Sequence, residues 1–254
     1  MSGQLEASPR GISIASCHRV LLEVTDSQLA VFNQIGGYLA LTEIDLEIDL
    51  DRKLPDRVAA YLDEANRRID HLFATEKNKR TPKFIPSDSE LFYWALEYLT
   101  SKDLTMGHVF CEWGSGYGLA TSLAALLGYE AYGIEIEPSL IEAAGNLARD
   151  LDVDSRFLCS SYMPEGVESY AGVGGEEIIR DHLGGEVEAL SYPGMDCEIT
   201  EIDVFYVFPW PGEQEFMEDF FDKIAVEGAI LMIYYGEEIR AYRKTFEEDD
   251  SEDY

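Results

Sequence analysis

Residues 109–118 read Val-Phe-Cys-Glu-Trp-Gly-Ser-Gly-Tyr-Gly, and this stretch decides the fold of the chain. It begins as a short buried strand that ends in an acidic residue, and glycines then stand at every second position. The Ala- and Leu-rich segment 119–127 predicts an apolar helix, for which Gly128 is a suitable C-terminal stop. A strand, a glycine-rich turn and a helix in this order form the ligand-facing corner of a Rossmann-like sheet.

The spacing of the glycines differs from that of dinucleotide-binding proteins, because Leu119 stands where their fingerprint requires a third glycine. The order Glu-x-Gly-x-Gly-x-Gly resembles the first motif of class I S-adenosylmethionine (SAM)-dependent methyltransferases. The resemblance implies that the loop 114–118 passes beneath the amino-acid part of SAM and that Glu112 lies near the SAM ammonium. A glycine-rich turn that only packs the helix on the strand is the alternative reading.

A second strand pattern covers residues 130–137 and is closed by Pro138, which suits the first turn of a helix. Gly133-Ile134-Glu135 resembles the second motif of the same family, Gly-aliphatic-acid. The resemblance implies that Glu135 accepts hydrogen bonds from the ribose hydroxyls. Glu137 is a competing candidate, because alternation places both acids on one side of the strand. A solvent-facing strand end is the other reading.

A helix over residues 91–99 is entered through Ile85-Pro86-Ser87, and Ser87 and Glu90 have capping-box spacing. This entry resembles that of several class I methyltransferases, notably non-SET protein-lysine methyltransferases, in which it covers the cofactor. Ser87 and the free amides behind it are then expected to meet the cofactor carboxylate. A plain capped helix is the alternative.

The third and fourth strand patterns, 155–161 and 203–208, depart from the family. Ser161 stands where many members have an Asp that binds the adenine amino group, although a hydroxyl can still accept that hydrogen bond. Phe208-Pro209-Trp210-Pro211 loosely resembles the Asp/Asn-Pro-Pro-aromatic motif of amino methyltransferases but lacks its leading polar residue. Trp210 can stack on a planar substrate or enclose a methylammonium. It can equally be an aromatic core plug in a rigid turn.

These motifs define the expected site. The expected cofactor-binding residues are Ser87, Glu112, Gly114, Ser115, Gly116, Gly118, Glu135, Ile136, Ser161 and Phe208. The catalytic candidates are Tyr206, Trp210 and Glu213, with Tyr206 and Glu213 as possible bases. The four histidines have no metal-ligand spacing, so no metal is expected.

The expected fold is α/β, with a doubly wound, Rossmann-like, mostly parallel sheet, an N-terminal β/helix extension and a shortened C-terminal end. Residues 1–54 form the β extension, in which a hairpin is expected around Gly36-Gly37 and a half-buried strand over 43–51. This extension is read as a partner contact, a homodimer contact or a lid, and it can cover the sheet edge where the family's antiparallel hairpin is reduced to one short strand over 238–246.

The methyltransferase domain is expected over residues 55–246, beginning with a helix after Pro55. Its insertion 162–200 is expected to overhang the cleft, and the acidic tail 247–254 is expected to be disordered.

The net charge is −31, from 50 acidic and 19 basic residues. Such a charge opposes binding to nucleic acid and to anionic membranes. A basic group at residues 77–83 is read as a solvated linker. There is no apolar run of membrane-spanning length, no signal-peptide pattern and no Cys-x-x-Cys pair, so a reduced, cytoplasmic setting is expected.

The leading hypothesis is SAM-dependent methyl transfer to a protein or small-molecule acceptor. The second hypothesis is a SAM-fold interaction module without chemistry, which the departures at Ser161 and Phe208 favour. A third, an NAD-dependent oxidoreductase, is disfavoured by Leu119.

Overall fold

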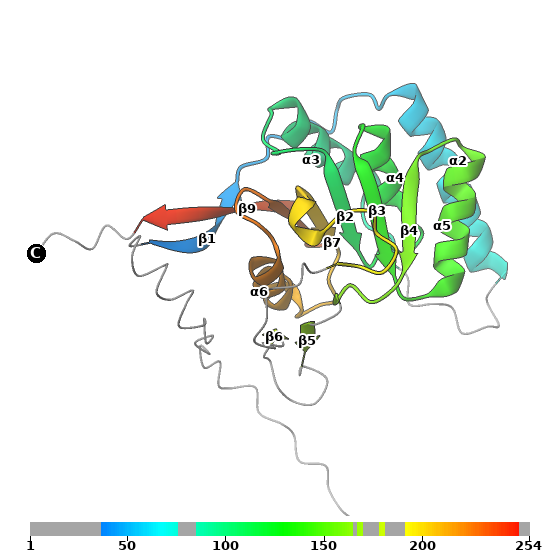
Figure 1. Ribbon diagram of the computed structural model, residues 1–254. Helices are drawn as coiled ribbons and strands as arrows, with labels where there is room; N and C mark the ends of the chain where they lie inside the picture. The colour runs from blue at the N-terminus through cyan, green and yellow to red at the C-terminus, as the bar shows by residue number, and fades with distance from the viewer. Residues whose placement is uncertain (1–36, 76–84, 165–166, 170–177, 181–190, 249–254) are drawn as a thin grey trace, which may run out of the picture.

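The computed structural model describes residues 37–75, 85–164, 167–169, 178–180 and 191–248, and they build a mostly parallel seven-stranded sheet flanked by helices (Figure 1). Five neighbouring strands are parallel, and two antiparallel strands complete one edge. From that edge the order is β1 (Gly37–Ile44), β9 (Ile239–Glu248), β8 (Ile230–Tyr234), β7 (Val204–Val207), β2 (Val109–Trp113), β3 (Glu130–Glu135) and β4 (Ser155–Cys159). The expected Rossmann-like fold class is therefore confirmed. A separate two-stranded sheet pairs β5 (Val167–Ser169) with β6 (Ile178–Arg180).

Helices cover both faces of the large sheet. Alternation along β2 and β7 sends Phe110 and Tyr206 into one core, and Trp113 and Phe205 into the other. The first core contains α2 (Asp56–Thr75), α3 (Ser89–Ser101), α4 (Leu119–Leu126) and α5 (Pro138–Asp150), and the second contains α6 (Gln214–Ile224). Burial on both faces explains why these strands read as continuous apolar runs, each large side chain adding about 2 kcal/mol of hydrophobic stabilisation.

The N-terminal strand β1 covers the sheet edge, as the sequence suggested. It pairs antiparallel with β9, and the hydroxyls of Thr42 and Thr245 are 2.8 Å apart across the two strands. The C-terminal end contributes this single antiparallel strand to the described sheet, but the strand has ten residues and is longer than expected. It continues to Glu248, so the tail expected from residue 247 is wrong for its first two residues, and the rest of that tail lies outside the described residues. Lys244 of β9 also donates to the Ala225 carbonyl at the end of α6, over 3.1 Å, and so ties strand to helix. The first arm of the expected hairpin lies outside the described residues.

The strand expected over residues 43–51 is wrong beyond Ile44. Residues 45–49 have no ladder partner, although their burial alternates as expected. Leu46 and Ile48 pack against the first core, whereas the acidic side chains between them are exposed. Alternation therefore marks the buried face correctly, but the chain leaves the sheet after Ile44 and crosses apolar surface without backbone pairing.

Helix α2 follows Pro55 as expected and buries Val58, Ala65 and Ile69 on one side. Helix α3 has a different cap from the expected one. Asp88 is the N-cap, and its Oδ1 accepts from the amides of Glu90 (3.1 Å) and Leu91 (2.9 Å). Ser87 therefore does not cap the helix, because the neighbouring carboxylate takes the donors.

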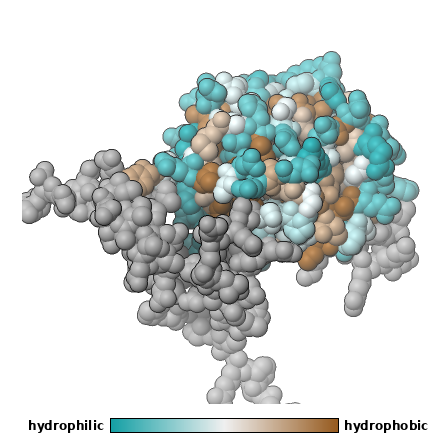
Figure 2. Space-filling view, viewed as in Figure 1, coloured by the Kyte–Doolittle hydropathy of each residue, from teal (hydrophilic) through white to brown (hydrophobic). Residues whose placement is uncertain are grey.

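In the coloured part of Figure 2, hydrophilic side chains predominate around the rim, and apolar residues lie between them. Within the described part of the chain, none of the helices combines the length and apolar character that a bilayer span requires.

Candidate active site

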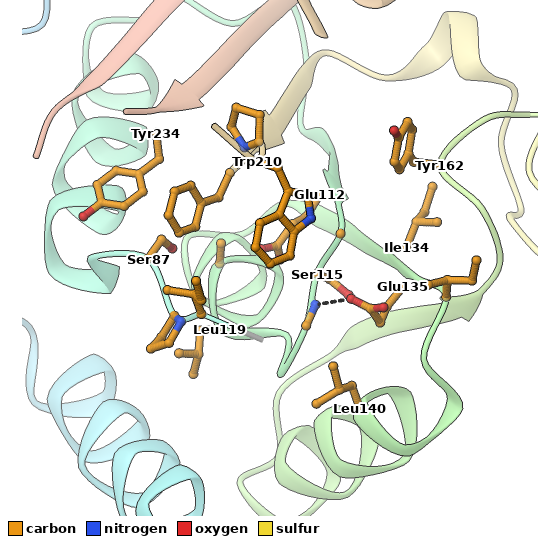
Figure 3. A pocket seen from close by; sticks show the side chains of 18 of the residues that line it. Ser87, Glu112, Ser115, Leu119, Ile134, Glu135, Leu140, Tyr162, Trp210 and Tyr234 are labelled. Carbon is orange, nitrogen blue, oxygen red and sulfur yellow. Dashed lines mark hydrogen bonds between the residues drawn. The ribbon is translucent and has the colours of Figure 1, made fainter. Parts of the chain in front are cut away.

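A cavity of about 880 Å³ lies beyond the carboxyl ends of β2, β3, β7 and β8 (Figure 3). Its size is within the range of small-molecule sites, and open α/β sheets bind ligands at this edge. Nine of the ten expected cofactor residues line it: Ser87, Glu112, Gly114, Ser115, Gly116, Glu135, Ile136, Ser161 and Phe208. Gly118 does not. Of the catalytic candidates, Trp210 lines the cavity, whereas Tyr206 and Glu213 are absent from its described lining.

The loop after β2 is held open toward the cavity. The amides of Gly114 and Ser115 both donate to the Ile134 carbonyl, over 2.9 and 2.8 Å. Gly114 has a φ of +73°, and a Cβ built on it would meet nothing within 4 Å. The hydroxyl of Ser115 is buried without a hydrogen-bond partner among the described residues. The loop thus offers free backbone surface and one unsatisfied polar atom to a ligand.

Gly118 serves packing instead. A Cβ there would lie 2.3 Å from Cε1 of Phe157, and the residue has a φ of +75° as N-cap of α4. Gly133 is similar, since its Cβ would lie 2.6 Å from Oγ1 of Thr121. For these two glycines, close contact between helix and strands explains the residue type.

Glu112 is a buried acid, only 7% exposed, at the end of β2. Its Oε2 accepts from the amide (2.9 Å) and the hydroxyl (2.5 Å) of Thr121 in α4, whereas Oε1 makes no hydrogen bond among the described residues. Burial raises the pKa of Glu112 to about 8, although the Thr121 hydrogen bonds oppose the increase. A cation in the cavity would restore the charged form.

Glu135 lies across the loop from Glu112 (Figure 3). Its two oxygens accept from the amides of Gly116 and Glu137, both over 2.9 Å, which orients the carboxylate. Each oxygen keeps a lone pair for a ligand hydroxyl. Glu137 also lines the cavity, but its carboxylate caps α5 by accepting from the amide and hydroxyl of Ser139.

Ser87 reaches the cavity, but the amides behind it are not free, because Asp88 accepts from them. The part of the expectation that relied on free amides is wrong. The Ser87 hydroxyl lies near that of Tyr206, which is buried in the first core against Phe92. Burial raises the pKa of Tyr206 far above its usual value, and the Tyr206 hydroxyl has no hydrogen-bond partner among the described residues.

The adenine side of the expected site is open. Ile136 is 73% exposed at the cavity wall, and Leu140 from α5 lines the same region. The Ser161 hydroxyl accepts from the Met163 amide over 3.1 Å, which leaves its own proton free to be donated.

The loop after β7 carries the residues that the sequence suggested for contact with the substrate. Phe208 meets the ring of Tyr234 edge-on at 4.8 Å between centroids. Trp210 is 47% exposed, so it is not a core plug, and its indole projects across the cavity in Figure 3. Glu213 lies at the start of α6, where its carboxylate accepts from the Trp210 amide over 3.4 Å.

The sequence reasoning missed three tyrosines that line the cavity: Tyr162, Tyr234 and Tyr235. All three stand just after, or at the end of, a parallel strand. Ligands bind beyond such ends, so that position was the signal available in the sequence.

The lining has a uniform electrostatic character. It contains Glu112, Glu135 and Glu137, and no Lys, Arg or His among its described residues. No group of three or more His, Cys, Asp or Glu side chains within the described ranges is placed to hold a metal ion.

No family model matches this chain, and no curated protein does. Its fold is similar to solved structures of methyltransferases. An RNA methyltransferase from Salinibacter ruber in complex with S-adenosyl-L-homocysteine is 18% identical, with a TM-score of 0.43 over 66% of this chain and 98% of that one. The O-methyltransferase TomG from Streptomyces achromogenes, in complex with SAM, is 14% identical, with a TM-score of 0.41 over 74% and 67%. A methyltransferase from Geobacter sulfurreducens is 12% identical, with a TM-score of 0.42 over 75% and 98%.

Proposed function

We propose that this protein is a SAM-dependent methyltransferase that acts on a protein or small-molecule acceptor. The observation that carries the proposal is the pair of carboxylates, Glu112 and Glu135, on the two sides of an open glycine loop with an unsatisfied Ser115 hydroxyl. These groups fit a ligand that has an ammonium at one end and a diol at the other.

Each residue then has a defined task. Oε1 of Glu112 accepts from the ammonium, and the Ser115 hydroxyl bonds the adjacent polar part of the ligand. Glu135, already oriented by two amides, accepts from the ribose hydroxyls. Ile136 and Leu140 supply apolar surface for the adenine, and the Ser161 hydroxyl supplies a donor.

Bound SAM supplies a methyl group on a sulfonium, which is already activated for in-line displacement. The chain mainly has to align the acceptor and exclude water. The rings of Phe208, Trp210 and Tyr234 line the same cavity, and we assign them to the acceptor side.

Calorimetry with SAM tests the proposal. We expect binding by the native protein, and at least a tenfold weaker affinity for Glu135→Ala, because hydrogen bonds to a charged group are worth about 1.5–3 kcal/mol each. Glu142→Ala, at an exposed acid on α5 outside the described lining, is the control and should retain the affinity. A folded protein that does not bind SAM, or equal binding by Glu135→Ala and native protein, would overturn the proposal.

A second candidate is a SAM-binding interaction module without turnover. It is favoured by the positions of Tyr206, which is buried in the core, and Glu213, which lies outside the described lining, because neither supplies a base in the cavity. Incubation with SAM and a cell extract separates the two candidates, since only an enzyme converts SAM to S-adenosylhomocysteine.

A further inference from the structure

We infer that the acceptor is an uncharged, flat aromatic heterocycle. Its reacting ring nitrogen has a free electron pair and bears no hydrogen. This inference rests on the proposed function and specifies its substrate class. It follows from three properties of the acceptor side of the cavity: flat walls, no available base and no cationic side chain among the described lining residues.

The walls of the acceptor side are aromatic. The ends of β7 and β8 contribute Phe208, Trp210, Tyr234 and Tyr235, and Tyr162 completes the set from the end of β4. The Phe208 and Tyr234 rings contact each other edge-on, and in Figure 3 the Trp210 indole lies between Tyr234 on one side and Tyr162 on the other. Rings of this kind present flat, apolar faces, which favour stacking on a flat ligand.

The hydroxyls on this side are unsuited to removing a proton. Tyr234 donates to the Gly236 carbonyl over 2.6 Å, and Tyr235 donates to Glu218 over 3.1 Å. Burial raises the pKa of Tyr162, Tyr234 and Tyr235 above the usual value.

The carboxylates are likewise engaged at the cofactor end. Oε2 of Glu112 accepts from Thr121 while its Oε1 is assigned to the cofactor ammonium, and Glu135 accepts from two amides. Glu137 caps α5 by accepting from Ser139. No His, Lys, Cys or Asp stands in the described lining. A nucleophile that must lose a proton finds no suitable acceptor among the described lining residues, whereas a ring nitrogen with a free electron pair needs none.

The charge balance agrees with this class. The nitrogen lone pair forms a bond to the methyl carbon, the carbon–sulfur bond breaks, and its electron pair stays on sulfur. The positive charge moves from sulfur to nitrogen and no proton is released. Aromatic faces and carboxylates both stabilise a cation, by about 0.5–2 kcal/mol for each cation–π contact. An anionic acceptor would meet only negative charge in the described lining.

Three probes of matched size test the inference by calorimetry in the presence of S-adenosylhomocysteine: 1-methylquinolinium as a product-like cation, quinoline as a neutral ring and 2-naphthoate as an anion. We expect the cation to bind at least tenfold more tightly than the anion, with quinoline between them.

Trp210→Leu should weaken cation binding at least fivefold, Trp210→Phe should retain most of it, and neither should change the affinity for S-adenosylhomocysteine. Phe73→Leu, an exposed aromatic outside the described lining, is the control.

The outcomes separate the two proposals. If S-adenosylhomocysteine binds but 2-naphthoate binds as tightly as the cation, if no probe binds, or if Trp210→Leu leaves cation binding unchanged, the acceptor class is wrong and the methyltransferase proposal stands. If the folded protein does not bind S-adenosylhomocysteine, the proposed function itself fails.

Discussion

Among the carboxyl groups of the site, that of Glu112 is the one whose ionisation is most strongly opposed by burial. It is enclosed at the end of β2, and its ionisation is opposed both by desolvation and by the nearby charge of Glu135. Two hydrogen bonds from Thr121 offset only part of that cost. A fold that keeps such a group at its cavity has a stability that depends on pH.

The direction of that dependence can be stated. The pKa of Glu112 is about 8 in the folded protein and about 4.5 when the group is unperturbed, so between these values the folded state holds one proton more than the unfolded state. The free energy of unfolding contributed by Glu112 therefore falls as pH rises from about 4.5 to about 8, by a few kcal/mol. We expect Glu112→Gln to remove this contribution. Thermal unfolding at pH values of about 5 and 8 measures it.

The control for this prediction is Glu142→Gln, an exposed acid on α5, which should retain the native difference between the two pH values. An equal loss of stability with pH in native protein and Glu112→Gln would contradict the assignment.

The loop glycines should separate binding from stability. Gly114→Ala adds a methyl group in open space at a positive φ and should cost about 1 kcal/mol of stability while weakening SAM binding. Gly118→Ala has similar backbone strain and also forces its methyl group into Phe157, so it should cost about 2 kcal/mol or more. Denaturant unfolding and SAM calorimetry on both variants check this. A Gly114→Ala protein with native affinity would place the ligand elsewhere.

At the scale of the element, the start of α3 shows what a sequence leaves open. Ser87, Asp88 and Ser89 are all suitable N-cap residues, and only the backbone decides among them. The extended conformation at Asp88, with φ of −70° and ψ of 101°, aims its carboxylate at the first helical amides. Capping-box spacing pointed to Ser87 because it counts residues and carries no information about that conformation.

Substitution of each candidate N-cap residue by alanine measures how much the cap contributes to stability. Asp88→Ala should lower the free energy of unfolding by about 1 kcal/mol, since it leaves the amides of Glu90 and Leu91 without their acceptor. Ser87→Ala removes no such bond and should change stability by less than half as much. Denaturant unfolding of the two variants decides the matter, and a larger loss for Ser87→Ala would refute the assignment.

The five parallel strands and the carboxylate pair could be predicted from the sequence, because each depends on local order. Segments such as 204–207 and 230–234 are apolar throughout, as doubly covered strands must be. Glu112 and Glu135 are each located by glycines close to them in the chain. Phe208 and Trp210 of the aromatic acceptor side were predicted from their motif, whereas Tyr162, Tyr234 and Tyr235 belong to no motif, and only their position at or after a strand end connects them with the cavity. The end of the strand at Ile44 was also hidden, because alternation is the same with and without a pairing partner.

At the scale of the whole molecule, the net charge of −31 is the property with the largest expected effect on electrostatic stability. Repulsion among so many like charges destabilises the compact state, and added salt screens it. We expect the unfolding temperature to rise by several degrees between about 0.05 and 1 M NaCl. Most of this rise in unfolding temperature is expected at the lower NaCl concentrations. Sucrose at matched osmolality should reproduce little of it, because sucrose does not screen charge. A flat or falling response to NaCl would mean that self-repulsion does not limit stability.

The pairing of β1 with β9 has a consequence for how the molecule is made. Thr42 and Thr245 touch although 203 positions separate them, so the ribosome completes β1 long before its hydrogen-bonding partner exists. Until β9 is synthesised, the backbone groups of β1 that face β9 have no hydrogen-bonding partner, and neither do those on the outer edge of β8. The ten-residue β9 therefore pairs with β8 and β1 in one late event, and only the outer edge of β1 then stays unpaired on that side of the described sheet. Interrupted translation just before β9 would release a chain prone to pair with other chains.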